Sequence, residues 1–209
     1  MAVITISRHF GAGGKTFGQR IADKLGYFFA DEDIIERAAV EIHVSPDWEE
    51  ILELEPGGKF QRHISKLNPF GESLMDRPLN DKKRFIDGYK YVELLNSIIT
   101  RFAEEGDAVI VGRGGQYILE DFEDAFHVLL TAEQKDRIQF MVDRYPYSYN
   151  KAAQVVKRME KRRANLYSFF GRKDYDDLTR YHLTINMSML SLEKAEELVC
   201  ELVSESEAE

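Results

Sequence analysis

Five short apolar runs, separated by longer stretches of different character, constrain the fold of this chain more than any other feature of its sequence. Most of them are apolar almost throughout instead of alternating between apolar and polar residues. Such runs are typical of strands that are covered on both faces of a parallel sheet. The runs span residues 2–6, 27–30, 108–111, 126–130 and 182–185. They predict a five-stranded parallel sheet.

Helical patterns fill much of the sequence between and after these runs. Apolar residues recur at helical spacing in stretches that begin near residues 16, 81, 134, 151 and 191. The expected caps are Gly26 and Gly106 at C-terminal ends, and Thr131 with Gln134, Asn150 and Ser191 at N-terminal ends. Because strands and helices alternate, we expect a layered α/β domain with right-handed crossovers.

Length, charge and cysteine content narrow the class of protein. The 209 residues suit one domain with an insertion, and residues 33–88, which contain several proline and glycine turns, interrupt the strand and helix pattern. The net charge of −9 argues against general binding to nucleic acid or to an anionic membrane. The sequence has no bilayer-length apolar run, no secretory signal pattern and one cysteine, Cys200. We therefore expect a cytoplasmic protein.

A glycine-rich segment follows the first apolar run and leads directly into the first helical pattern. Its candidate phosphate-binding residues are Gly11, Gly13, Gly14, Lys15 and Thr16. A strand, a glycine turn and a helix N-terminus together direct backbone N–H groups at an anion. Lys15 would contact the β- and γ-phosphates and the Thr16 hydroxyl would bind Mg²⁺, although His9 stands where the strict motif has a glycine.

Two other interpretations of this segment exist. The glycines could simply form a tight connection between strand and helix. They could also begin a dinucleotide-binding fingerprint, because Asp31 or Asp33 lies about twenty residues further on. The first interpretation leaves the adjacent Lys15 and Thr16 without a purpose, and the second gives Lys15 no role.

Residues 151–173 form a basic segment in an acidic chain. They hold eight basic residues and one acid, Glu160, so this segment carries +7 and the remainder −16. Arg158, Lys161 and Arg162 have the spacing of one helix face. A solvated charged face is the ordinary explanation. The alternative is a movable cationic lid that closes over a triphosphate and excludes water.

Four motifs in order resemble those of the cytidylate kinase-like family, a branch of the P-loop nucleoside-monophosphate kinases. They lie at residues 4–14, 109–114, 161–167 and 183–193, which is nearly the whole chain. The resemblance implies a P-loop fold with three α/β/α layers, a helical lid at 151–173 and a monophosphate-binding insertion at 33–88. It also implies transfer of phosphate from ATP, with Mg²⁺, to a nucleoside monophosphate, for which CMP or dCMP is the expected acceptor.

The resemblance also assigns roles to particular residues. Lys15, Arg113, Arg158 and Arg162 would be catalytic. Lys161 and Arg163 would join the loop residues in binding ATP phosphates, and Asp31, Arg37 and Arg113 would bind the acceptor. From the residues alone, Asp31 could equally be a helix N-cap for Ile34, Arg37 a solvated side chain and Arg113 a surface ion-pair partner.

Two further functional hypotheses remain open from the sequence. The acceptor could be a small non-nucleotide metabolite with a hydroxyl group. Alternatively the chain could be a non-catalytic nucleotide-binding module, because His9 stands where the strict P-loop motif has a glycine and Val111 where cytidylate kinases proper have an aspartate. The sequence does not fix the oligomeric state.

Overall fold

The computed structural model describes residues 2–35, 37–38, 88–172 and 176–206 of the 209-residue chain. Most of the predicted acceptor insertion, residues 39–87, lies outside the described part, and so does Lys173, the last residue of the predicted lid. The limits of the insertion and the lid therefore stay predictions.

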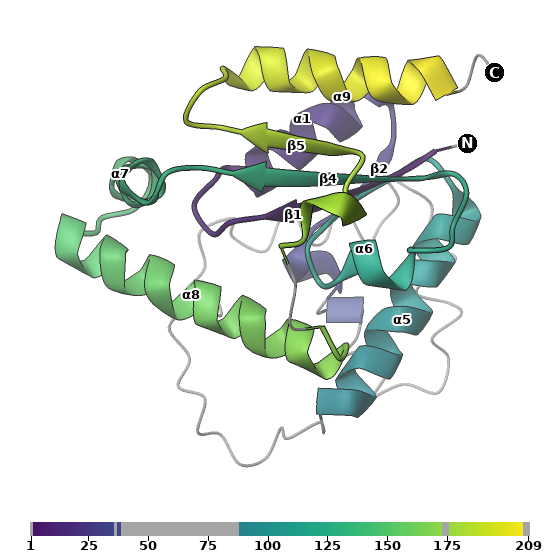
Figure 1. The fold of residues 1–209 in the computed structure, drawn as a ribbon, viewed down its shortest axis with the longest axis horizontal. Coiled ribbons are helices and arrows are strands. Elements are labelled where there is room, and N and C mark those ends of the chain that lie inside the picture. The colour runs from purple at the N-terminus through teal and green to yellow at the C-terminus, as the bar shows by residue number, and fades with distance from the viewer. Residues whose placement is uncertain (1, 36, 39–87, 173–175, 207–209) are drawn as a thin grey trace.

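The described chain contains one five-stranded sheet in which all neighbouring strands are parallel (Figure 1). The strand order is β2-β3-β1-β4-β5. The strands are β1 (Val3–Arg8), β2 (Phe28–Ala30), β3 (Ala108–Val111), β4 (Ala125–Thr131) and β5 (Leu183–Asn186). The five apolar runs are thus confirmed as strands. The main difference is at β1, which continues two residues beyond the predicted end and includes Arg8.

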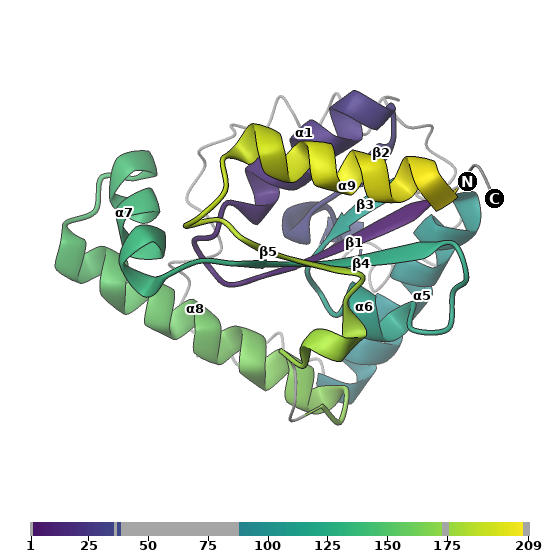
Figure 2. The same ribbon diagram turned by 45° about the horizontal axis from the view of Figure 1, so that its top comes forward.

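Helices cover both faces of the sheet. One face carries α1 (Gly14–Leu25) and α9 (Leu192–Ser206), which lie side by side, and the other carries α5 (Gly88–Glu105) and α6 (Gly115–Ile118) (Figure 2). Two further helices, α7 (Gln134–Arg144) and α8 (Tyr149–Phe169), pack against each other beyond the carboxyl end of β4, and a 3₁₀ turn, Leu178–Arg180, precedes β5. The predicted three-layer α/β/α fold is confirmed.

Alternate residues of the central strand β1 face the two helical layers. Ile4 and Ile6 join a buried cluster with α1 and α9, whereas Val3 joins the cluster with α5. All three side chains are at most 1% exposed. Burial on both faces explains why this run is apolar almost throughout. It also fixes the strand end, and hence the glycine segment, at the carboxyl edge of the sheet.

The helix ends confirm three of the five expected caps. Gly26 adopts the left-handed conformation after α1, and Gly106, with φ 73°, follows the last residue of α5. The Ser191 hydroxyl accepts a hydrogen bond from the Lys194 N–H at 3.2 Å, which caps the start of α9.

The other two expected caps are wrong. Thr131 is the last residue of β4, and its hydroxyl donates to the Ile185 carbonyl, so the N-cap of α7 is Glu133 instead. The helix α8 begins earlier than Asn150 would allow. Its N-cap is Ser148, which has an extended backbone and whose hydroxyl accepts a hydrogen bond from the Lys151 N–H. The helix therefore begins at the next residue.

Among the helices of the described residues, none combines the length and apolar character that crossing a membrane requires.

Candidate phosphate-binding site

The glycine segment connects the end of β1 to the start of α1 at the carboxyl edge of the sheet. The strand ends at Arg8 and the helix begins at Gly14. Gly11 and Gly13 between them have φ values of 88° and 82°, which residues with side chains rarely adopt. The turn therefore brings backbone N–H groups and the positive end of the α1 dipole to one place, as an anion site requires.

Lys15 is the second residue of α1, and its ammonium group forms ion pairs with two carboxylates. Its Nζ is 2.5 Å from Asp31 Oδ2 and 2.9 Å from Asp33 Oδ2. Partial burial disfavours the charged ammonium, but the hydrogen bonds and charges of Asp31 and Asp33 outweigh this effect and raise the pKa of Lys15. The Lys15 side chain is nevertheless 66% exposed, so its position depends on these two ion pairs.

Asp31 follows β2 and also caps a helical segment. Its Oδ1 accepts a hydrogen bond from the Ile34 N–H at 3.0 Å, which confirms the N-cap interpretation. The residue is 4% exposed. A carboxylate that is fixed in this way, next to Lys15, lies where the predicted acceptor site begins, and the acceptor-binding role of Asp31 stays a prediction.

Arginines from three elements surround the carboxylate of Glu32. Arg113, which directly follows Gly112 at the end of β3, is 2.5 Å from Glu32 Oε1 through its Nη2, and Arg8 donates from Nη2 to Oε2 at 2.7 Å. Burial opposes ionisation of Glu32, but the charges of Arg113, Arg8 and Arg162 outweigh it and lower its pKa to about 2. We call Glu32, Arg8, Arg113 and Arg162 the Glu32 cluster.

The backbone of Arg113 supports a special role for this residue. Its φ of 55° is in the left-handed region, and its side chain is 8% exposed. Non-glycine residues adopt this conformation at a cost that surrounding contacts must offset. The ion pair with Glu32 is such a contact, because it fixes a buried guanidinium beside the glycine segment.

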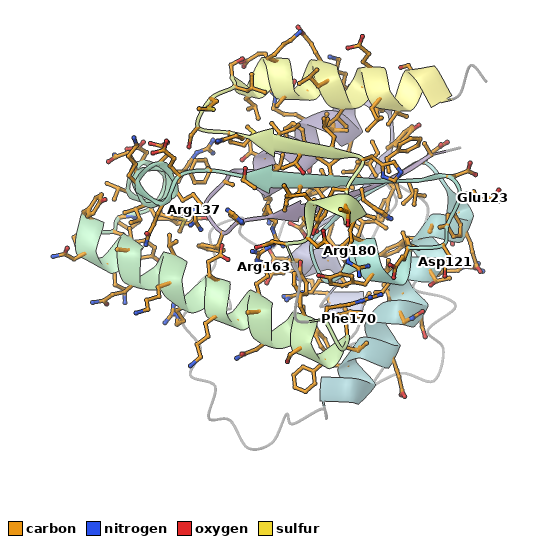
Figure 3. The ribbon with its side chains drawn as sticks, in the orientation of Figure 1. Asp121, Glu123, Arg137, Arg163, Phe170 and Arg180 are labelled. Carbon is orange, nitrogen blue, oxygen red and sulfur yellow. The ribbon has the colours of Figure 1, made fainter. Side chains whose placement is uncertain are left out.

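A second carboxylate contacts the glycine segment from the opposite direction. Glu160 of α8 accepts hydrogen bonds from the Phe10 N–H at 2.5 Å and from Arg137 of α7 at 3.0 Å. Arg163, one turn further along α8, donates to the other oxygen of Glu160. Figure 3 shows Arg137 and Arg163 between α8 and the strands. One helix of the predicted lid is therefore fastened directly to the glycine segment.

Asp176 completes this second group. Both terminal nitrogens of Arg163 donate to Asp176, at 3.0 and 2.9 Å, and His9 Nε2 lies 3.5 Å from Asp176 Oδ2. Burial raises the pKa of Asp176, but the hydrogen bonds from His9 and Arg163 and their charges outweigh it, so the pKa is lowered overall. We call Glu160, Arg137, Arg163 and Asp176 the Glu160 cluster.

The remaining predicted site residues occupy several positions. Arg158 and Lys161 are exposed on α8, whereas Arg162 is partly buried and close enough to Glu32 to lower its pKa. Thr16 is the third residue of α1 and partly buried, and Arg37 is partly buried in the helical segment after Asp31. The structure thus brings Arg113 and Arg162 together near the glycine segment.

Sequence reasoning did not select five charged residues of the site, namely Arg8, Glu32, Arg137, Glu160 and Asp176. Three of them carried a signal: Arg8 is a charged residue at the end of an apolar strand, Glu32 follows the selected Asp31, and Glu160 is the single acid of the basic segment. Arg137 and Asp176 are ordinary charged residues in their surroundings, and only the folded chain brings them to the site.

Comparison with known proteins supports the fold and indicates a family. The sequence profile of the cytidylate kinase-like family matches residues 3–189. No functionally curated protein matches the chain in sequence.

Solved structures share the fold at low sequence identity. An uncharacterized protein from Eubacterium ventriosum ATCC 27560 has a TM-score of 0.68 and 16% identity, with 98% of each chain covered. A shikimate kinase from Acinetobacter baumannii, in complex with shikimate, has a TM-score of 0.51 and 15% identity, covering 100% of this chain and 96% of its own. A gluconokinase from Sinorhizobium meliloti 1021 has a TM-score of 0.50 and 16% identity, covering 98% and 94%. These likenesses establish the fold of a P-loop kinase.

Proposed function

Because this chain belongs to the cytidylate kinase-like family, we propose that it transfers a phosphoryl group from ATP to a nucleoside monophosphate, with CMP or dCMP as the preferred acceptor. The family and the fold support a kinase. The choice of a monophosphate acceptor is our inference from the family resemblance, and the charged groups beside the glycine segment support it.

The observation that carries this choice is the Glu32 cluster. The guanidinium groups of Arg8 and Arg113 contact one carboxylate there, and the charge of Arg162 acts on the same carboxylate, so these four side chains carry three positive charges and one negative charge. An ATP phosphate at the α1 N-terminus and a monophosphate beside it would together bring several negative charges. Guanidinium groups match phosphate oxygens in pairs, so this excess suits two phosphate-bearing ligands better than one.

The proposed roles are those that the family resemblance implies for these residues. The residues that would bind the ATP phosphates are Gly11, Gly13, Gly14, Lys15, Thr16, Lys161 and Arg163. Those that would bind the acceptor are Asp31, Arg37 and Arg113. The transfer itself would involve Lys15, Arg113, Arg158 and Arg162. Phosphoryl transfer needs mainly positioning and neutralisation of charge. The acceptor phosphate oxygen is already a nucleophile, so the proposal includes no general base.

Mg²⁺ fits this proposal through the Thr16 hydroxyl. The described residues contain no group of three or more His, Cys, Asp or Glu side chains that could hold a metal ion by themselves. Kinase magnesium ions typically use one or two protein oxygens together with substrate phosphates, so a single hydroxyl beside the glycine segment is a suitable donor. When bound, the ion would neutralise phosphate charge.

A second candidate is transfer to a small metabolite hydroxyl. The fold shared with a shikimate kinase and a gluconokinase favours this candidate, because the names of these two enzymes indicate acceptors without a nucleoside. The cationic excess of the Glu32 cluster favours the monophosphate instead.

A panel assay separates the two candidates. The full chain is incubated with ATP, Mg²⁺ and one acceptor at a time: the ribo- and deoxyribonucleoside monophosphates, shikimate and gluconate. We expect a nucleoside diphosphate from CMP or dCMP, detected by chromatography, and no product when Mg²⁺ is chelated. Product from a metabolite alone would replace the proposal by the second candidate. ATP binding without any product would favour a non-catalytic module.

A further inference from the structure

The side chain of Arg8 lies along the start of α1. A Cβ atom built on Gly14, the first residue of that helix, would lie 2.8 Å from Arg8 Cγ, 3.1 Å from its Cβ and 3.2 Å from its Cδ. Any side chain at position 14 would therefore have to displace the aliphatic part of Arg8. The glycine leaves open the space at the helix N-terminus, and Arg8 fills it.

The guanidinium group of Arg8 lies against a second glycine, Gly112. A Cβ on Gly112 would lie 2.1 Å from Arg8 Nη1 and 2.9 Å from its Cζ. Gly112 follows β3, which is the neighbour of β1 in the sheet, and immediately precedes Arg113. Gly14 at the start of α1 and Gly112 after β3 thus both leave the space that the Arg8 side chain occupies.

This path joins the two halves of the proposed reaction. It begins at the N-terminus of α1, where ATP phosphates would bind, and ends at Glu32 beside Arg113, where the acceptor would bind. A phosphoryl group that moves from donor to acceptor must pass between these points. The Arg8 guanidinium carries five N–H donors, and its hydrogen bond to Glu32 uses Nη2.

Lys15 has a different position. Its ammonium is directed to Asp31 and Asp33, and its side chain is 66% exposed, whereas the Arg8 side chain is 18% exposed. Of the two cations in the segment, Arg8 is the one that is enclosed and fixed against the helix N-terminus.

We propose that Arg8 is the principal phosphate-binding cation of the glycine segment, and that its guanidinium, held over Gly14 and Gly112, contacts the phosphoryl group in transit between ATP and the acceptor. This inference rests on the proposed function and adds a residue to it. Lys15 then has a secondary part, in which it links α1 to the acceptor side through Asp31 and Asp33.

The first test compares nucleotide binding by matched variants of the full chain. The affinities of ATP and of adenosine are measured by calorimetry for the unaltered protein and for Arg8→Gln, Arg8→Lys, Lys15→Gln and Arg20→Gln. Arg20 pairs with Glu196 on α9 and controls for the loss of one positive charge on the same side of the chain. We expect Arg8→Gln to weaken ATP at least tenfold without changing adenosine binding. Arg8→Lys should restore part of the loss, Lys15→Gln should weaken ATP binding but by less than Arg8→Gln does, and Arg20→Gln should stay within twofold.

Loss of the folded state would imitate a loss of binding, so a second pair of variants uses Gly14. Gly14→Ala introduces no charge change and favours the helix by itself, but its methyl group would displace Arg8. We expect Gly14→Ala to weaken ATP binding when Arg8 is present and to have less than a twofold effect in the Arg8→Ala protein. Thermal unfolding of each variant shows whether it is folded.

The outcomes distinguish this inference from the proposed function. The inference is overturned if Arg8→Gln binds ATP within threefold of the unaltered protein, if Lys15→Gln loses more affinity than Arg8→Gln, or if the effects of Gly14→Ala and Arg8→Ala are additive. If the unaltered protein phosphorylates CMP in those cases, the proposed function still stands. If it binds ATP but phosphorylates no monophosphate, the function fails while the binding data still decide the role of Arg8. Absence of ATP binding overturns both.

Discussion

Two glutamates, Glu32 and Glu160, form ion pairs with arginines on opposite sides of the glycine segment, and the two groups of side chains differ in charge and in backbone contact. Glu32 follows β2 and meets Arg8 and Arg113 on the β3 side of β1, whereas Glu160 of α8 meets Arg137 of α7 on the β4 side. Their side chains are almost equally exposed, at 27% and 25%. Burial therefore does not distinguish them, and the difference lies in charge and in backbone contact.

The Glu160 cluster is balanced in formal charge, because its two arginines face two carboxylates, Glu160 and Asp176. Glu160 also binds the Phe10 N–H, so this cluster fastens α8 to the glycine segment. In the Glu32 cluster Arg8 and Arg113 form ion pairs with one carboxylate, on which the charge of Arg162 also acts. We infer that the Glu160 cluster, apart from the ATP contact proposed for Arg163, mainly holds α8 on the glycine segment, and we propose that the Glu32 cluster is arranged for an anionic ligand.

The largest expected effect tests this division through catalysis. Arg113→Gln should lower the rate of transfer to the acceptor roughly 100-fold, because it removes a fixed charged donor from the proposed transferring group. Arg137→Gln removes the same charge from the Glu160 cluster and should lower the rate less than about tenfold. The measurement is kcat and KM for the acceptor identified by the panel assay. Equal losses in the two variants would contradict the division into ligand-binding and structural clusters.

The fold was predictable because it depends on local patterns. Runs that are apolar almost throughout predicted all five strands, and the order of motifs indicated the family and its layers. The end of β1 was missed because Ser7 and Arg8 are polar and look like the start of a loop. Register with β4, in which Arg8 pairs with Leu130, extends the strand and directs the Arg8 side chain along Gly14.

The site was predictable only where its residues have local signals. Arg113 was selected because it follows a strand and stands among glycines, and Arg162 because it belongs to a basic helix. The contact between Phe10 and Glu160 joins residues 150 positions apart, and no pattern in the sequence specifies it. The neighbours of Lys15 in the sequence indicate the lysine of a phosphate-binding loop. Its contacts with Asp31 and Asp33 could not be predicted, because they depend on where β2 lies relative to α1.

Removing each glutamate should separate the clusters in stability. Glu32→Gln should lower the free energy of unfolding by about 2 kcal/mol, because Arg8 and Arg113 both lose their carboxylate contact in a partly buried place. Glu160→Gln should cost about 1 kcal/mol, because Arg163 keeps two hydrogen bonds to Asp176 and the glutamine oxygen can still accept from Phe10. Urea unfolding at pH 7 measures both values. A larger loss of unfolding free energy for Glu160→Gln than for Glu32→Gln would show that the Glu160 cluster contributes more to stability than the Glu32 cluster.

The smallest effect concerns acid, and it isolates the charge of Glu32. Its pKa in the folded protein is about 2, below the ordinary 4.5, because the charges of Arg113, Arg8 and Arg162 outweigh the effect of burial. Below pH 4.5 the unfolded chain takes up a proton that the folded chain does not. The stabilisation from Glu32 is therefore complete above pH 4.5 and is lost as the pH falls toward 2, by at most about 1.4 kcal/mol for each pH unit.

The effect of Glu32 is measured as the difference in unfolding free energy between the unaltered protein and Glu32→Gln, because another group loses stability over a neighbouring pH range. Burial, together with the charge of His182, lowers the pKa of His127 to about 4 from 6.5, so stability is also lost as the pH falls from 6.5 to 4. His127 is in β4 and bonds to Thr5, away from both clusters, so Glu32→Gln should keep this loss unchanged. The difference in unfolding free energy between the unaltered protein and Glu32→Gln should therefore be constant from pH 7 to 4.5 and should decrease by about 1 kcal/mol between pH 4.5 and 3.5. A difference that stays constant to pH 3.5 would mean that the arginines do not hold Glu32 ionised, and the cationic excess inferred for that cluster would then be wrong.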